Sequence, residues 1–125
     1  ILLSKPATPG HENDPIVVLQ AHMDMVCQKT PESNHNFSRD PIKLKVDGEY
    51  VTADGTTLGA DNGIGMAIAL ACLVDPNVEH GPLEVLLTVD EETGLTGAFN
   101  LRKGFFKGKF LLNLDSIFEL DLIFL

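Results

Sequence analysis

Basic residues are scarce in this sequence. Lysine and arginine number 9 among 125 residues, against 18 aspartates and glutamates, and the formal net charge is −9. A chain this acidic is repelled by nucleic acid and by anionic membrane surfaces, so neither is expected as a partner. The same excess of carboxylates indicates that some of them lie close together around a compensating cation.

Cysteine is nearly absent as well, with only Cys27 and Cys72. Neither belongs to a Cys-x-x-Cys pair, and we expect both to be free thiols, as in cytoplasmic proteins. The sequence also lacks the Gly-x-Ser-x-Gly pattern of a nucleophile elbow. Glycines recur at 59, 63 and 65, but no Gly-Lys-Ser/Thr follows them, so a phosphate-binding loop is excluded.

Long apolar runs are missing too. The run of residues 63–74 is too short to cross a bilayer, and the N-terminus has neither the charged region nor the cleavage site of a signal peptide. We therefore expect a cytoplasmic location. Because the chain starts at Ile1 rather than at a methionine, we also expect it to be part of a longer protein.

What the sequence does contain is an alternation of short apolar segments with strand and helix patterns. A chain of 125 residues has the size of one domain. Residues 1–4 are expected to form an edge strand, and a short helix is expected within residues 94–103, with Leu95, Phe99 and Leu101 facing inward. Three apolar runs read as buried strands, at residues 16–21, 83–89 and 110–114. The alternation predicts a doubly wound α/β fold.

One helix is apolar on every side. It is expected to begin at Asp61 or Asn62, near its N-cap, and to end at residues 75–76. Because it has no polar face for water, we expect it to be buried within a layered domain. A β-hairpin is predicted before it, at residues 42–46 and 49–53, with Asp47 and Gly48 as a type I′ turn. One face of the hairpin is expected to be exposed, at the sheet edge or over the site.

Potential metal ligands follow each buried strand. They are His22 and Asp24, then Glu91 and Glu92, and finally Asp115. Ligand sites in open α/β sheets lie at the carboxyl ends of the strands, and Asp61 would reach the same end from the loop before its helix. Each feature alone is common in surface loops, but their collection at one edge favours a metal site. One imidazole with several carboxylates suits Zn²⁺, with Mn²⁺ or Co²⁺ as substitutes, and a shared carboxylate would allow a metal pair.

Five segments carry a resemblance to a known family. They are residues 20–26, 55–65, 80–84, 91–94 and 113–116. These segments resemble the aminoacyl-histidine dipeptidases, also described as Xaa-His, cytosol non-specific or carnosinase-like dipeptidases, of the two-zinc aminoacylase and carboxypeptidase family. The resemblance covers residues 1–116. It implies a partial three-layer αβα zinc-peptidase-like catalytic domain with an inserted β-hairpin.

The resemblance also implies residue roles. His22 and Asp115 would bind one zinc ion and Glu92 the other, while Asp61 would bridge the two ions. Asp24 would orient the imidazole of the metal-binding histidine. Glu91 would act as the general base that takes a proton from the attacking water.

The implied function is hydrolysis of the peptide bond of small dipeptides such as Xaa-His. A downstream histidine of the second zinc site and the domain that binds substrate and often forms a homodimer are not in this chain. The apolar segment 117–125 matches nothing expected of the family, and His11, His35 and His80 are expected to be ordinary surface histidines. We expect the chain alone to be inactive. A related deacylase or carboxypeptidase, and a non-catalytic metal-binding remnant, remain as alternatives.

Overall fold

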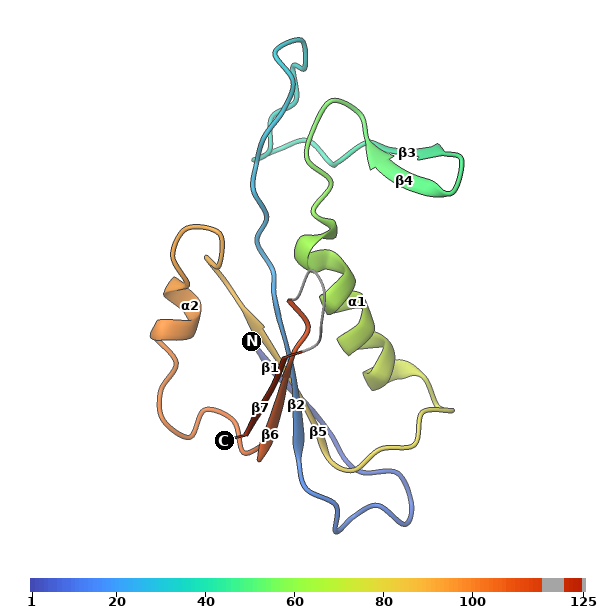
Figure 1. Ribbon diagram of the computed structural model, residues 1–125, viewed down its shortest axis with the longest axis vertical. Coiled ribbons are helices and arrows are strands. Elements are labelled where there is room, and N and C mark those ends of the chain that lie inside the picture. The colour runs from blue at the N-terminus through green and yellow to red at the C-terminus, as the bar shows by residue number, and fades with distance from the viewer. Residues whose placement is uncertain (116–120, 125) are drawn as a thin grey trace.

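A computed structural model gives the fold and describes residues 1–115 and 121–124. Its largest element is a five-stranded sheet with the strand order β1-β5-β2-β6-β7 (Figure 1). The strands are β1 Leu2–Lys5, β2 Val17–His22, β5 Leu83–Thr88, β6 Phe110–Asn113 and β7 Asp121–Phe124. β2 pairs in parallel with both β5 and β6, whereas β1 and β7 pair antiparallel at the two edges.

The central strands are apolar on both sides because both faces of the sheet are covered. On one face Leu19, Val85 and other buried side chains pack against the helix α1, Ala60–Val74. On the opposite face Val18 and Leu86 pack with Leu101 and another side chain that follows the short helix α2, Thr96–Phe99. The prediction that the central runs are covered strands, with residues 1–4 forming an edge strand, is therefore confirmed.

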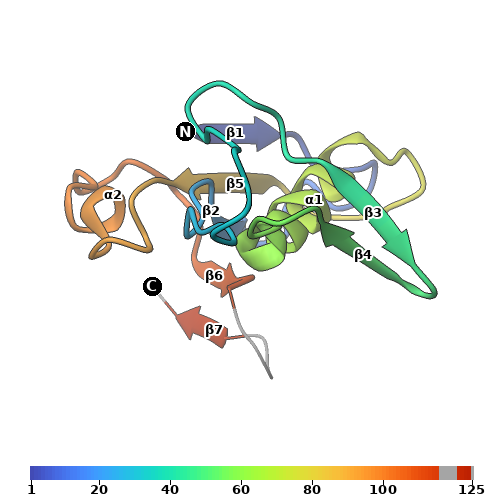
Figure 2. The same ribbon diagram turned by 90° about the horizontal axis from the view of Figure 1, so that it is seen from above.

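The helix α1 comprises Ala60–Val74 and lies across one face of the sheet, as Figure 2 shows from above. The expected burial on every side is wrong. Ile64, Ile68 and Val74 are 62%, 49% and 78% exposed, because only one side of the helix contacts the sheet and no other described segment covers the opposite side. The expected capping by Asp61 or Asn62 is also wrong. Both have non-helical backbone angles, and their side chains bond elsewhere.

The hairpin consists of β3 Leu44–Asp47 and β4 Tyr50–Ala53 and forms a separate two-stranded sheet. It differs from the prediction in two ways. Asp47 pairs with Tyr50, so the turn residues are 48 and 49, and only Gly48 of these takes a positive φ, which a type I′ turn would require at both. Both faces are exposed, and the hairpin extends away from the main sheet rather than along its edge (Figure 1).

The second helix is shorter than expected. α2 spans Thr96–Phe99, and the predicted inward placement is wrong for Leu95 and Phe99, which are 41% and 79% exposed. Leu101 does pack against the sheet, as predicted. The loop that follows is held by Glu84 of β5. The Oε2 atom of this buried side chain accepts hydrogen bonds from the backbone N–H groups of residues 107 and 108 at 2.7 and 3.0 Å.

Three further predictions concern the cysteines, the C-terminal segment and membrane-spanning helices. Cys27 and Cys72 are free, as expected. Of the apolar segment 117–125, residues 117–120 and 125 lie outside the described residues, and residues 121–124 form β7 beside β6. Within the part of the chain that the structure describes, no helix has the length and apolar character needed to span a membrane.

Candidate metal centre

The site lies where three neighbouring strands end. β5, β2 and β6 run parallel, so the residues after them meet at one edge of the sheet. His22 is the last residue of β2, Glu91 and Glu92 follow β5, and Asp115 follows β6. Asp61 reaches the same edge from the start of α1, which crosses over β2.

His22 is the centre of the cluster and is only 1% exposed. Its Nδ1 atom lies 2.9 Å from the backbone carbonyl oxygen of Asp24. A carbonyl oxygen can only accept, so Nδ1 carries a proton, and Nε2 is the ring atom that can bind a metal ion once it has lost its own proton. Nε2 lies 3.1 Å from Oδ1 of Asp61 and 3.6 Å from Oδ2 of Asp115. Nε2 therefore faces two carboxylates, and the bond at Nδ1 leaves it as the ring atom available to a metal ion.

The carboxylate of Asp24 connects the histidine to the two glutamates. Its Oδ1 accepts a hydrogen bond from the backbone N–H of Glu91 at 3.1 Å, and its Oδ2 accepts one from the N–H of Glu92 at 3.2 Å. Oδ1 also lies 3.5 Å from Nδ1 of His22, farther than the backbone carbonyl of the same aspartate. Asp24 thus orients the imidazole mainly through its backbone and fixes the glutamate turn through its side chain.

The donor atoms fall into two groups, each within 4.8 Å: His22, Asp61 and Glu92 form one, and His22, Glu91 and Asp115 form the other. The donor set contains an imidazole nitrogen and carboxylate oxygens without a thiolate. That chemistry fits Zn²⁺ or Mn²⁺.

Two acids of the cluster, Glu91 and Asp115, hold their protons more firmly than free acids do. Burial raises the pKa of Glu91, and the neighbouring charge of Asp115 raises it further. Burial likewise raises the pKa of Asp115, with a smaller opposing effect from His22. Burial by itself lowers the pKa of His22, but the hydrogen bond to Asp61 and the charge of Asp115 outweigh it, so that pKa is raised. Carboxylates that repel each other in this way are relieved by a bound cation.

Asp24 differs from these acids. Burial raises its pKa, but the N–H groups of Glu91 and Glu92 stabilise the carboxylate and together hold the pKa below its usual range. Asp24 therefore ionises more readily than Glu91 and Asp115 do.

Asn62 is a site residue that the sequence pattern did not single out, except as a candidate helix cap. It is 5% exposed, and its Nδ2 donates to the backbone oxygen of Leu114 at 3.0 Å and to Oδ1 of Asp115 at 3.2 Å. Its position next to Asp61 in the sequence was the only available signal.

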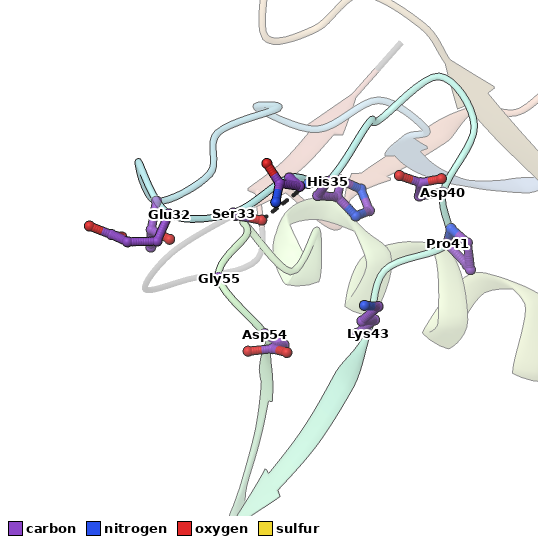
Figure 3. Close-up of a pocket in the computed structure, with 10 residues that line it drawn as sticks. Glu32, Ser33, His35, Asp40, Pro41, Lys43, Asp54 and Gly55 are labelled. Atoms are coloured by element: carbon purple, nitrogen blue, oxygen red, sulfur yellow. Dashed lines mark hydrogen bonds between the residues drawn. The ribbon is translucent and has the colours of Figure 1, made fainter.

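One cavity borders the cluster, and a larger one lies away from it. A cavity of about 210 Å³ is bordered by Asp61, Asn62 and Asp115 and opens beside the cluster. Another, of about 610 Å³, lies between the loop around His35 and the base of the hairpin and contains none of the predicted site residues (Figure 3). Among the described residues, His11, His35 and His80 stay outside the metal-ligand groups.

Comparison with known proteins identifies relatives. The sequence profile of Peptidase family M20/M25/M40 matches residues 18–123. The cytosol non-specific dipeptidase of Escherichia coli (strain K12) is 60% identical over 116 residues, which cover 93% of this chain and 24% of that protein. The chain thus spans about a quarter of that relative's length.

Solved structures agree with the sequence match. The aminoacylhistidine dipeptidase of Vibrio alginolyticus superimposes with a TM-score of 0.89 at 62% identity, covering 92% of this chain and 24% of that chain. The aminopeptidase PepT of Bacillus cereus gives a TM-score of 0.67 at 33% identity, with 92% and 29% covered. The expected α/β peptidase-like fold is confirmed, with part of such a domain present here.

Proposed function

Because the chain belongs to Peptidase family M20/M25/M40, we propose that it is part of the catalytic domain of a metal-dependent dipeptidase that hydrolyses small dipeptides such as Xaa-His. The observation that carries the proposal is the convergence of His22 with carboxylates from three other segments. The dipeptide specificity is supported by two relatives described above, which are a cytosol non-specific dipeptidase and an aminoacylhistidine dipeptidase.

The proposed cofactor is a pair of zinc ions, with Mn²⁺ or Co²⁺ as substitutes. His22 and Asp115 would hold one ion, Glu92 the other, and Asp61 would bridge both. When bound, zinc lowers the pKa of a water molecule to about 7 and polarises the peptide carbonyl. The support is the donor chemistry of the cluster, one imidazole with several carboxylates, whereas the division between the two ions rests on the resemblance.

The proton transfers are assigned to Glu91. Its raised pKa brings it closer to the operating pH, where a general base is most effective. Glu91 would take a proton from the attacking water and later deliver it to the leaving amine. Asp24 would keep this side chain in place, because its carboxylate holds the backbone N–H of Glu91.

The chain alone is proposed to be inactive. The second ion would have only Asp61 and Glu92 from the described residues, and the rest of a protein about four times as long is needed to grip the substrate. The complete protein is proposed to act in the cytoplasm, as the name of the Escherichia coli relative suggests, and a homodimer is compatible with the proposal. A related deacylase or carboxypeptidase, or a non-catalytic metal-binding remnant, are the competing proposals.

The test combines metal titration with a peptidase assay. The complete protein that contains this chain is loaded with Zn²⁺ or Mn²⁺ and supplied with β-alanyl-histidine, Gly-His and an N-acyl amino acid. Metal binding with dipeptide turnover supports the proposal. Turnover of the N-acyl amino acid alone favours a deacylase, and metal binding without any turnover favours the remnant.

A further inference from the structure

Asn62 is a buried amide whose side-chain NH₂ group donates only to residues of the site. It follows Asp61 directly in the sequence, yet the two side chains contact different groups. Asp61 reaches Nε2 of His22 at 3.1 Å, whereas Asn62 reaches the backbone oxygen of Leu114 and the carboxylate of Asp115. Two adjacent residues therefore connect the start of α1 to both β2 and β6.

The orientation of the amide is fixed by its neighbours. The carbonyl oxygen of Leu114 cannot donate, so the group facing it must be the NH₂ of Asn62. The second N–H of the same group then points to Oδ1 of Asp115. The amide oxygen is buried and has no hydrogen-bond partner in the described part of the chain. Burying an amide oxygen without a partner costs stability. A role for the two bonds that the NH₂ group donates would explain why the amide is kept in this place.

Gly65 provides the space for this amide. A Cβ atom built at Gly65 would lie 2.3 Å from Oδ1 of Asn62 and 2.9 Å from the oxygen of Leu114. Any side chain at position 65 would therefore displace the amide or the end of β6. One turn of α1 is left without a side chain where the amide packs against it.

We propose that Asn62 is a positioning residue that holds Asp115 toward His22, an inference that rests on the proposed metal site. Asp115 has few other restraints: its backbone N–H donates to Oδ1 of Asn113 at 2.8 Å, and Nε2 of His22 lies 3.6 Å from its Oδ2. The carboxylates of Asp61 and Asp115 both face Nε2 of His22 and repel each other. The amide of Asn62 offsets that repulsion and keeps Asp115 within reach of a shared ion.

Removing the amide should therefore weaken metal binding without removing a ligand. Groups that orient metal ligands typically contribute about 10–100-fold to metal affinity. We expect Asn62→Ala to weaken zinc binding by about this factor. Asn62→Asp should weaken it at least as much, because it replaces the donor beside Asp115 with another negative charge.

Asn77 offers a matched control. Its Nδ2 also donates to an aspartate carboxylate, Oδ1 of Asp75, at 3.0 Å, but at the exposed far end of α1. Asn77→Ala removes the same kind of bond outside the site. Zinc affinity of the control should equal that of the unchanged chain.

The experiment measures three properties of the 125-residue chain. Zinc affinity comes from calorimetric titration, and the absorption spectrum of bound Co²⁺ reports the ligand geometry, which a purely structural loss would leave unchanged. In the metal-free chain, NMR hydrogen exchange compares the side-chain NH₂ protons of Asn62 with those of Asn77. We expect weaker zinc binding and an altered Co²⁺ spectrum for Asn62→Ala, and slow exchange only for Asn62.

Each outcome separates the two levels of the argument. A folded Asn62→Ala chain with unchanged zinc affinity and Co²⁺ spectrum would overturn the positioning role. If that variant does not fold, rapid exchange of the Asn62 amide in the unchanged chain would overturn it, and slow exchange would support it. If the unchanged chain binds no zinc and its Asn62 amide is protected, the proposed metal site fails while the bond to Asp115 stands.

Discussion

His22 shows how much of the site depends on one side chain. Its Nδ1 is committed to a backbone carbonyl, and its Nε2 faces Asp61 and Asp115. The ring is almost fully buried, so its orientation is set by these contacts rather than by solvent. The two glutamates after β5 also differ in their surroundings: Glu91 is half-buried beside Asp115, whereas Glu92 is exposed.

That difference leads to a prediction for the complete protein. Glu91→Gln should remove most dipeptide turnover, by about 10²–10⁴-fold, because loss of a general base typically has this effect. Zinc content should stay nearly intact, because the assigned ligands remain. Measured kcat and metal analysis check this. Loss of zinc from Glu91→Gln, or loss of rate alone from Glu92→Gln, would exchange the two roles.

A second prediction concerns pH. The folded state raises the pKa of His22 above its unfolded value of about 6.5, so the protonated ring stabilises the metal-free fold below that pH. This contribution is lost as the pH rises through the higher folded pKa. The raised pKa values of Glu91 and Asp115 act in the same direction, because their ionised forms are disfavoured in the fold.

Urea unfolding of the chelator-treated chain should therefore show lower stability at about pH 8 than at about pH 6. Zinc should reverse the trend, since protons compete with the metal for these ligands. His22→Gln should flatten the metal-free dependence. His11, whose pKa is raised first by its hydrogen bond to Asp14, is exposed and outside the site, so His11→Gln is the control. If the pH dependence of stability disappeared in His11→Gln and not in His22→Gln, the effect would belong to His11 and the prediction would be wrong.

The residue types of the site could be predicted from the sequence, but their contacts could not. The pattern placed His22, Glu91 and Asp115 after parallel strands, which is enough to bring them to one edge. The bonds from Asp24 to the glutamate turn and from Asn62 to Asp115 join segments more than 50 positions apart. Such bonds depend on how the loops meet, and no local pattern encodes that.

At the scale of elements, the strands were easier to predict than the hairpin and the helices. Buried strands give unbroken apolar runs, as in β5, where every position is buried. The hairpin register moved by one residue because Asp47 remains in the strand and Gly48 supplies the positive φ. For α1, an apolar sequence indicated burial by something, but only one side of the helix meets its partner in this chain.

β5 and the loop before β6 offer a test of how elements are joined. Glu84→Ala removes the acceptor of two partly buried backbone hydrogen bonds and should lower the free energy of unfolding by about 1–3 kcal/mol. Glu84→Gln keeps a carbonyl acceptor and should cost less. Denaturant unfolding measures both, with the exposed Glu49→Ala as a control. Equal stability of the unchanged chain and Glu84→Ala would show that the loop does not depend on this bond.

At the scale of the whole molecule, the proposed assignment divides the ligands unequally between the two ions. In the assignment that the resemblance implies, one ion has His22, Asp61 and Asp115, whereas the other has only Asp61 and Glu92 from the described residues. We expect calorimetric titration of the chain with Zn²⁺ to give one ordinary site and one weak site. Two equally tight ions would contradict the assignment, and an Asp115→Asn variant should lose the tighter of the two.

The chain itself is expected to show no dipeptidase activity with β-alanyl-histidine or Gly-His. A metal-pair hydrolase must hold water and substrate in reacting geometry, and a misplacement of about 1 Å can cost 10²-fold in rate. Amine release is measured against a Glu91→Ala control. Turnover above that control, proportional to the first power of chain concentration, would show that the chain works alone.

The uncovered side of α1 determines how the chain behaves in concentrated solution. Ile64, Ile68 and Val74 form an exposed apolar stripe, and two molecules can remove it from water by self-association. Ile64 borders the cavity beside the cluster, whereas Ile68 does not, so a change at position 68 leaves the lining of that cavity intact. Ile68→Glu should therefore keep the chain dispersed and reduce its uptake of an apolar fluorescent dye. The mutant should take up zinc as the unchanged chain does.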